Sequence, residues 1–352
     1  MIPFLKPILP STERLIPYLK KIEENGYYSN NGQFVQQFEK DLQTYLQTDR
    51  DIVVVNNGTM GLALALKALG VESGKYVMIP SFTFAATASV CRFPDYVDIE
   101  PDCWCMDPLQ VKDCGAIIPV DALGNPCDKE KFEAFGNHYE VPVIFDSASS
   151  IGATYNGKRV GNFGDIEVFS LHATKCLPVG EGGFLSIRDP EVAHRVRMLK
   201  NFGFDNDRVA HIEGTNAKMP EILAAIGIEA LKDLPQHMAN RQRYVKMYME
   251  RLDKLVFQKV RPGCQHGYQI LSVLVRDAEG VVEEMRQRGI QVRRYYSPPL
   301  HQQPAYRSRQ YLPITEGIAN AVINLPLYSI MEEATIDFVC KNLKEVLCVL
   351  PS

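Results

Sequence analysis

Residues 145–183 read FDSASSIGATYNGKRVGNFGDIEVFSLHATKCLPVGEGG, and two residues in this stretch indicate the chemistry of the protein. Asp146 ends an apolar run, and Lys175 follows 29 positions later (175 − 146), between a polar turn and a Gly-rich turn. A lysine amine can condense with an aldehyde, and a carboxylate can keep a heterocyclic nitrogen protonated. The pair therefore predicts a cofactor that carries both an aldehyde and a cationic ring.

Short apolar runs alternate with helical patterns on both sides of this stretch. The predicted strands are DIVVV, KYVMIP, DYVDIE, GAIIPV, VPVIFD and IEVFSL, and helical spacing is seen over residues 11–24, 34–47 and 59–70. Such alternation is typical of an α/β sheet with helices on both faces.

The pattern changes near residue 230. Residues 214–252 predict a helix, a break at Pro235 and then a long amphipathic helix. Beyond them, a strand at 268–275, a helix at 279–289, an apolar-aromatic run at 290–296 and a helix at 332–347 predict a smaller α/β unit. We expect a large cofactor-binding domain over residues 1–232, including an N-terminal helical segment, and a small C-terminal domain over residues 233–352.

Composition excludes several classes of protein. The net charge is −4 and the pI is near 6.0, which argues against a nucleic-acid-binding surface. The nine cysteines are odd in number and form no CxxC pair, so we expect free thiols, a reducing cytoplasm and no metal site. The apolar segment at 61–71 is short and interrupted by Lys67, and the N-terminus lacks the pattern of a signal peptide, so we expect no membrane partner.

Two further motifs suit a phosphorylated pyridine. NNGTMG, residues 56–61, stands between a strand and a helix, where Gly58 and Thr59 are placed to bind a phosphate. PSFTFAAT offers Phe82 and Phe84, one of which could stack on the ring.

Each signal also has a purely structural interpretation: a helix cap at residues 56–59, core packing of a Phe, a capping role for Asp146, and a solvated Lys175. All four in this order predict pyridoxal 5'-phosphate (PLP).

The chain resembles the DegT/DnrJ/EryC1/StrS family of sugar aminotransferases. The blocks that carry the resemblance follow family order over nearly the whole chain: NNGTMGLALALKALG, IPSFTFAATAS, IPVDALGNPCD, FDSASSIGATYNGKRVGNFGD, FSLHATKCLPVGEGG, GTNAKMPEILAAIG, YYSPPLHQQPAY and INLPLYSIM.

The resemblance implies the type I aminotransferase fold, an α/β fold with a large mixed-sheet PLP domain. It also implies a homodimer with shared active sites. By position, Lys175 would bind the cofactor aldehyde and Asp146 the ring nitrogen, as the two catalytic residues. The other cofactor-binding residues would be Phe84 against the ring, Gly58, Thr59 and Ser170 at the phosphate, Asn216 from the partner subunit, and Ser149. Tyr295, Tyr296 and His301 would line the sugar side, although packing between the domains is an equally plausible role for these three.

The chain departs from the family at three positions. Ser149 stands where many relatives have glutamine, Ile151 where they have histidine, and Asp121 replaces the histidine of a PVH block. These departures bear on substrate choice and leave the expected cofactor unchanged.

The resemblance implies transamination from an amino acid, most plausibly L-glutamate, to a nucleotide-linked keto sugar. The favoured acceptor is a nucleotide-linked 4-keto-6-deoxyhexose, and the product would be a 4-amino sugar for a surface polysaccharide such as lipopolysaccharide O-antigen. Two alternatives stay open: a PLP-dependent sugar dehydratase and a catalytically silent regulatory relative. Dehydratases of this kind carry histidine in place of the lysine, whereas this chain has Lys175.

Overall fold

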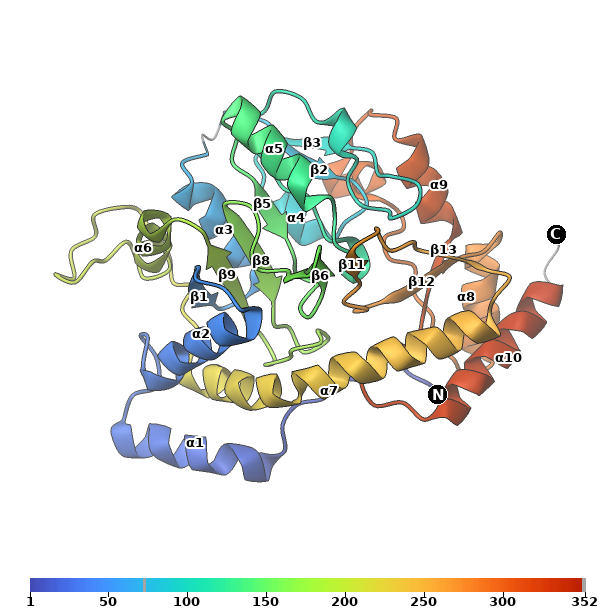
Figure 1. The fold of residues 1–352 in the computed structure, drawn as a ribbon, viewed down its shortest axis with the longest axis horizontal. Helices are drawn as coiled ribbons and strands as arrows, with labels where there is room; N and C mark the ends of the chain where they lie inside the picture. The colour runs from blue at the N-terminus through green and yellow to red at the C-terminus, as the bar shows by residue number, and fades with distance from the viewer. Residues whose placement is uncertain (72–73, 350–352) are drawn as a thin grey trace.

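The centre of the molecule is a seven-stranded sheet (Figure 1). The computed structural model describes residues 1–71 and 74–349. The strands are β1 (Asp51–Val55), β2 (Val77–Pro80), β3 (Pro94–Val97), β4 (Ala116–Ile117), β5 (Ile144–Asp146), β8 (Ile166–Ser170) and β9 (Gly183–Ile187). They form two ladders, β3-β2-β4 and β5-β8-β9-β1. Two parallel bridges, Ile117 with Val143 and Val120 with Asp146, join the ladders. Strand β9 runs antiparallel to both of its neighbours, whereas the other pairs are parallel. The expected mixed sheet is confirmed.

Helices cover both faces of this sheet, as the sequence predicts. In β1, Val53 and Val55 face a core with α3 (Gly58–Ala68) and α6 (Pro190–Leu199), whereas Ile52 and Val54 face a core with α2 (Gln33–Leu46). Successive side chains of a strand point to opposite faces, so a strand with two covered faces reads as one continuous apolar run. The run DIVVV has that pattern, with all four apolar residues buried.

The predicted break at Pro235 is wrong. One helix, α7 (Glu221–Arg251), extends over 31 residues and contains this proline (Figure 1). A proline inside a helix removes one backbone N–H and costs about 3 kcal/mol. Packing on both sides of Pro235 opposes that cost, because Leu234 and Met238 enter the core beside α2 and Tyr244 and Tyr248 enter the core of the C-terminal unit. The helix therefore joins the two parts of the chain as a single element.

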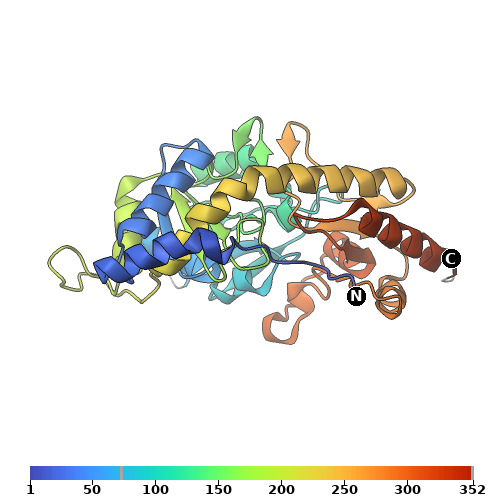
Figure 2. The same cartoon turned by 90° about the horizontal axis from the view of Figure 1, so that it is seen from below.

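The C-terminal unit has its own antiparallel sheet, in the order β10-β12-β13. Its elements are β10 (Val256–Phe257), β12 (Leu271–Leu274), β13 (Val322–Leu325), α8 (Ala278–Gln287), α9 (Pro313–Ala321) and α10 (Glu333–Val349). The first residues of the chain also lie here, because Ile2 pairs with Ile290 (Figure 2). Strand β11 (Cys264–Gln265), which follows α7, pairs with β6 (Thr154–Tyr155) of the large sheet region. The two parts are thus connected by strand pairing as well as by α7, and a boundary at residue 232 stays a prediction.

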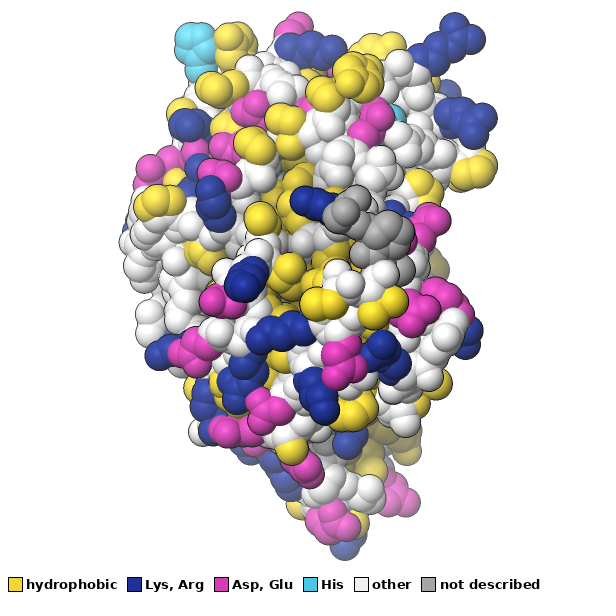
Figure 3. All heavy atoms as spheres, turned by 90° about the vertical axis from the view of Figure 1, so that its right-hand side faces the viewer, with side chains coloured by type: hydrophobic (Ala, Val, Ile, Leu, Met, Phe, Trp, Pro, Cys, Tyr) yellow, Lys and Arg dark blue, Asp and Glu magenta, His cyan; other side chains and the backbone are white. Residues whose placement is uncertain are grey.

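The surface mixes charges of both signs. On the face in Figure 3, Lys and Arg side chains alternate with Asp and Glu rather than forming a basic field. In residues 1–71 and 74–349, no helix has the length and apolar character needed to span a bilayer. Within the same ranges, no cluster of three or more His, Cys, Asp or Glu residues has the arrangement of a metal site.

Candidate active site

Asp146 lies at the carboxyl end of β5, where open α/β sheets bind ligands. Its side chain is 6% exposed. Thr87 Oγ1 donates to Asp146 Oδ2 at 2.8 Å, and the Ala148 backbone N–H donates to Oδ1 at 3.2 Å. Thr87 belongs to α4 (Ala85–Ser89), the short helix that follows β2, and its hydroxyl is also 3.0 Å from that of Thr83. Two neighbouring segments therefore fix the orientation of the carboxylate.

Lys175 lies on the loop that connects the antiparallel strands β8 and β9. Its backbone N–H donates to the His172 carbonyl at 2.8 Å, and Ala173 N–H donates to the Gly180 carbonyl at 2.8 Å, so the loop is ordered by its own backbone bonds. Lys175 Nζ points toward the turn after β5 and donates to Ser149 Oγ at 3.1 Å. The geometry thus brings Asp146, Ser149 and Lys175 into one site.

Burial acts on both titratable groups of this site. It lowers the pKa of Lys175, and the opposing attraction of Asp146 does not offset this effect. Burial raises the pKa of Asp146, whereas the bonds from Thr87 and Ala148 and the charge of Lys175 act in the opposite direction. A lysine with a lowered pKa has more free amine at neutral pH, which is the form that attacks an aldehyde.

The N-terminus of α3 meets the end of β8 beside this site. The first-turn N–H groups of Gly58 and Thr59 have no acceptor within the helix, and Asn57 Oδ1 caps the next one, accepting from Met60 N at 2.8 Å. A Cβ on Gly58 would lie 3.3 Å from Ser170 Cβ, which shows how closely the two residues approach. The three residues predicted for the phosphate are therefore adjacent.

Two aromatic segments flank Asp146. Phe84 precedes α4, three residues before Thr87, and is 62% exposed, so its ring is accessible to a ligand. Tyr296 packs edge-on against Phe82, with ring centroids 5.3 Å apart, and stacks on Tyr295 at 5.9 Å. Burial, followed by the charge of Asp146, raises the pKa of Tyr296, so this phenol lies near the carboxylate.

The remaining predicted residues are placed differently. His301 is 2% exposed, with Nδ1 2.6 Å from Ser81 Oγ and Nε2 3.2 Å from Glu316 Oε1. Both ring nitrogens are therefore engaged within the chain, which favours the packing role considered above for His301. Asn216 is exposed on the segment between α6 and α7, next to Ala217, whose carbonyl accepts from Asn56 N at 2.9 Å. Its contribution to a partner's site stays a prediction.

Sequence reasoning missed Thr87 and Gln269. Gln269 Nε2 donates to the Thr174 carbonyl at 2.7 Å and so holds the residue before Lys175. Its signal was weak, since one glutamine ahead of a strand does not reveal a partner 95 positions away. Thr87 was easier to find, because it lies in the first turn of the helix that follows β2, at the same edge of the sheet as Asp146.

The residues present fit PLP. The two free N–H groups at the start of α3 suit its phosphate, a buried carboxylate its ring nitrogen, an exposed aromatic ring its pyridine face, and a lysine with a lowered pKa its aldehyde. Three buried side-chain acceptors, among residues 1–71 and 74–349, have no hydrogen-bond partner, and two of them, Asn56 Oδ1 and Gln269 Oε1, stand beside the helix end and the lysine loop. Buried polar atoms of this kind are normally satisfied, so they mark places where a ligand or water would bind.

Comparison with known proteins agrees with this reading. The model of the DegT/DnrJ/EryC1/StrS aminotransferase family matches residues 11–344. The chain is 31% identical to the GDP-perosamine synthase of Caulobacter vibrioides (strain ATCC 19089 / CIP 103742 / CB 15), covering 97% of each chain. It is 29% identical to the dTDP-4-amino-4,6-dideoxy-D-glucose transaminase of Shigella dysenteriae, covering 97% of this chain and 98% of the relative. A solved structure of DesI with its TDP-sugar product superposes with a TM-score of 0.91 at 30% identity, covering 99% and 93% of the two chains.

These matches confirm the type I aminotransferase fold and the PLP cofactor expected from the sequence. The chain belongs to the DegT/DnrJ/EryC1/StrS aminotransferase family, and it is a PLP-dependent aminotransferase.

Proposed function

We propose that this enzyme transfers an amino group from L-glutamate to a nucleotide-linked 4-keto-6-deoxyhexose. The amine of Lys175 lies beside Ser149 and Asp146, and this position is the observation that carries the proposal. The choice of substrate is supported by the names of the two relatives, both of which describe nucleotide-linked amino sugars.

Each residue of the site has a separate role in the proposed reaction. PLP, when bound, supplies a carbonyl that condenses with amines and a cationic ring that withdraws electrons from the adjoining carbon. Lys175 would bind that carbonyl, and its free amine would serve as the general acid–base of the reaction. Ser149 Oγ accepts from the amine at 3.1 Å and so directs it toward the ring. Asp146 holds the ring nitrogen, and Phe84 stacks on the ring.

The phosphate is held by Gly58, Thr59 and Ser170, with Asn216 from the partner of a homodimer. We place Tyr295 and Tyr296 on the sugar side, with Tyr296 nearest the cofactor, and assign His301, whose ring nitrogens contact Ser81 and Glu316, to packing behind them. The nine cysteines are unpaired, which supports a reducing cytoplasm. The product would serve amino-sugar synthesis for a surface polysaccharide.

The lysine assignment is tested with Lys175→Arg against Lys158→Arg, a control at an exposed position. After incubation with PLP, the unmodified protein and the control should show a visible absorbance band that borohydride removes, and the Lys175 variant should lack it. The variant should also lose multiple turnover with glutamate and the keto sugar. Retained turnover in Lys175→Arg would overturn the assignment.

The substrate is tested by presenting the aminated form of the cofactor, bound to the enzyme, with a panel of nucleotide-linked keto sugars. Return of the visible band with 4-keto-6-deoxyhexoses, faster than with 3-keto sugars, supports the proposed acceptor. A deoxygenated sugar without net amine transfer would instead indicate the dehydratase, and a protein that stays colourless with PLP would indicate a silent relative.

The shared site has a separate test. Mixing inactive Lys175→Ala and Asn216→Ala subunits should restore part of the activity, because a mixed dimer contains one site without either change. No recovery after subunit exchange would place Asn216 outside the partner's site.

A further inference from the structure

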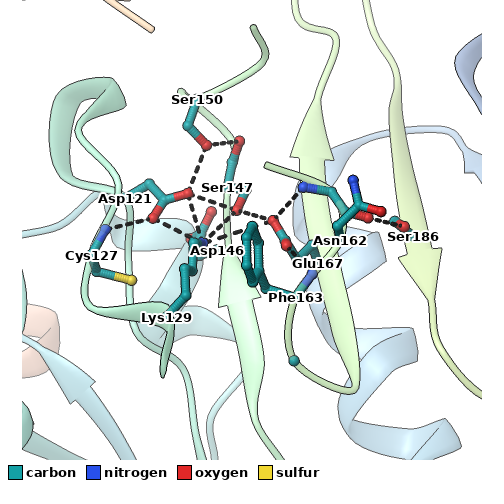
Figure 4. A network of polar contacts seen from close by, with 12 residues as sticks. Asp121, Cys127, Lys129, Asp146, Ser147, Ser150, Asn162, Phe163, Glu167 and Ser186 are labelled. Atoms are coloured by element: carbon teal, nitrogen blue, oxygen red, sulfur yellow. Dashed lines mark hydrogen bonds and ion pairs between the residues drawn. The ribbon is translucent and has the colours of Figure 1, made fainter. Parts of the chain in front are cut away.

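A cluster of buried polar and charged side chains lies at the turn that follows Asp146 (Figure 4). The cluster consists of Asp121, Lys129, Ser147, Ser150 and Glu167, each of them 1% exposed or less. Buried ions are costly unless paired, so a lysine with no exposed surface calls for an explanation. The cofactor-binding residues proposed above do not include this lysine.

Lys129 is enclosed by two acids and an aromatic ring. Its Nζ lies 3.0 Å from Asp121 Oδ1 and 3.7 Å from Glu167 Oε2, and 3.9 Å from the centroid of the Phe145 ring. Burial alone would lower the pKa of Lys129, but Asp121 and Glu167 outweigh it and the pKa is raised. The side chain is therefore an ammonium ion, and its charge is neutralised by acids inside the protein.

Asp121 holds the turn through hydrogen bonds with two of its serines. Asp121 Oδ2 accepts from Ser147 Oγ at 2.8 Å and from Ser150 Oγ at 2.7 Å. Each of these two serines directly follows a site residue, Ser147 after Asp146 and Ser150 after Ser149. The Asp121 backbone N–H also donates to the Asp146 carbonyl at 3.0 Å.

Lys129 balances the negative charge of the two acids in this network. Glu167 Oε2 lies 3.0 Å from Ser147 Oγ, and the single hydroxyl proton of Ser147 can serve only one of the two acids. Lys129 Nζ lies 3.0 Å from Asp121 Oδ2 and 3.4 Å from Ser147 Oγ, so the ammonium donates directly to Asp121 and places a positive charge beside both acids. Without it, two buried carboxylates would face each other across one serine.

A carboxylate at position 121 can accept both serine hydroxyls, and it then requires a nearby cation. Lys129, eight positions later on α5 (Lys129–Tyr139), meets that requirement.

We propose that Lys129 and Asp121 are positioning residues that hold the 146–150 turn, so that Asp146 and Ser149 keep their places toward the cofactor ring and Lys175. They touch neither the cofactor nor the substrate. The inference rests on the proposed roles of Lys175 and Asp146, and it gives the buried ion pair a function in catalysis beyond stability.

The test compares Lys129→Met and Ser150→Ala with Leu343→Ala, a control in the fully buried core of α10 that lowers stability without touching the turn. Two quantities are measured: the dissociation constant of PLP, and the rate at which Lys175 of the apoprotein is labelled by PLP and borohydride, followed by mass spectrometry. Lys129→Met should weaken PLP binding about tenfold and slow the labelling of Lys175, and Ser150→Ala should do so by a smaller factor. Leu343→Ala should lower the unfolding midpoint and leave both quantities unchanged.

Three outcomes are distinguishable. Unchanged affinity and labelling in Lys129→Met, or equal changes in Leu343→Ala, would overturn the positioning role. If Lys129→Met does not fold, Ser150→Ala decides, and unchanged values there would overturn the role as well. Failure of the unmodified protein to be labelled at Lys175 would instead refute the proposed function.

Discussion

At the scale of single residues, hydroxyl groups form hydrogen bonds with Asp146 and Lys175, the two titratable groups of the candidate active site. Thr87 donates to Asp146, and Ser149 accepts from Lys175. The Thr87 contact is short and buried, where a hydrogen bond to a charged group contributes about 1.5–3 kcal/mol. In its proposed role the carboxylate must stay ionised to hold a cationic ring nitrogen, so we expect the Thr87 contact to affect cofactor binding.

Replacing Thr87 with valine tests this contact. Thr87→Val removes the donor while keeping the shape, so the pKa of Asp146 should rise further. The affinity for PLP should fall about 10- to 100-fold, equivalent to 1.5–3 kcal/mol. Thr87→Ser retains a hydroxyl and should stay near the unmodified value. Equal affinity in the valine and serine variants, measured by equilibrium dialysis, would show that the hydroxyl has no such role.

At the scale of elements, the proposed phosphate site depends on how closely a helix end approaches a strand pair. Gly183 begins β9 opposite Ser170, the last residue of β8. A Cβ on Gly183 would lie 2.7 Å from Gly58 N and 2.8 Å from the Phe169 carbonyl oxygen, distances that real Cβ atoms do not show. The helix end that supplies the N–H groups of Gly58 and Thr59 can therefore reach this position only because residue 183 has no side chain.

Gly183→Ala should force the start of α3 away from Ser170. We expect a loss of about 1–3 kcal/mol in the free energy of unfolding from overpacking, together with weaker binding of PLP. Gly317→Ala in α9 is the control, because its added Cβ meets open space and a helical alanine is favoured over glycine. Urea titrations and PLP binding measure both effects. An unaltered PLP affinity in Gly183→Ala would show that the cradle does not require this close approach.

At the scale of the whole molecule, the segment after α7 connects the two parts of the chain to the lysine loop. Arg241 of α7 donates to the carbonyls of Tyr268 and Gln269, and Gln269 in turn donates to Thr174. His266 lies in this segment, stacked on Tyr268 with ring centroids 4.3 Å apart and with Nε2 3.2 Å from Gln258 Oε1. Burial lowers the pKa of His266 to about 3, so the native protein holds this ring neutral.

The buried histidine predicts a loss of stability in acid. The unfolded chain takes up a proton on His266 near pH 6.5, whereas the native state does so only near pH 3. The unfolded state therefore binds more protons in this window, and the free energy of unfolding should fall by up to about 1.4 kcal/mol for each pH unit below 6.5. His266→Asn keeps an acceptor for the Tyr268 N–H, which now donates to Nδ1 at 2.7 Å, and cannot titrate. Urea unfolding at pH 7 and pH 5 should show a smaller pH difference in this variant; an unchanged difference would assign the acid sensitivity to other groups.

Much of the fold followed from local pattern. Apolar runs such as DIVVV predicted the buried strands correctly, because a strand with both faces covered shows no polar alternation. The helix of residues 59–70 was predicted to within a few residues, as α3 (Gly58–Ala68). Pro235 misled the prediction, since a local rule carries no information about the two hydrophobic cores that hold α7 together across it.

The sequence by itself determined the class of fold, the family and the Asp146–Lys175 pair, because strand and helix periodicities and motif order are written along the chain. Only the tertiary structure decided what surrounds that pair. Thr87, Gln269 and Lys129 act over separations of 59, 95 and 8 positions, and no periodicity encodes such contacts. Burial likewise arises only when distant segments pack, so the lowered pKa of Lys175 is a property of the folded molecule.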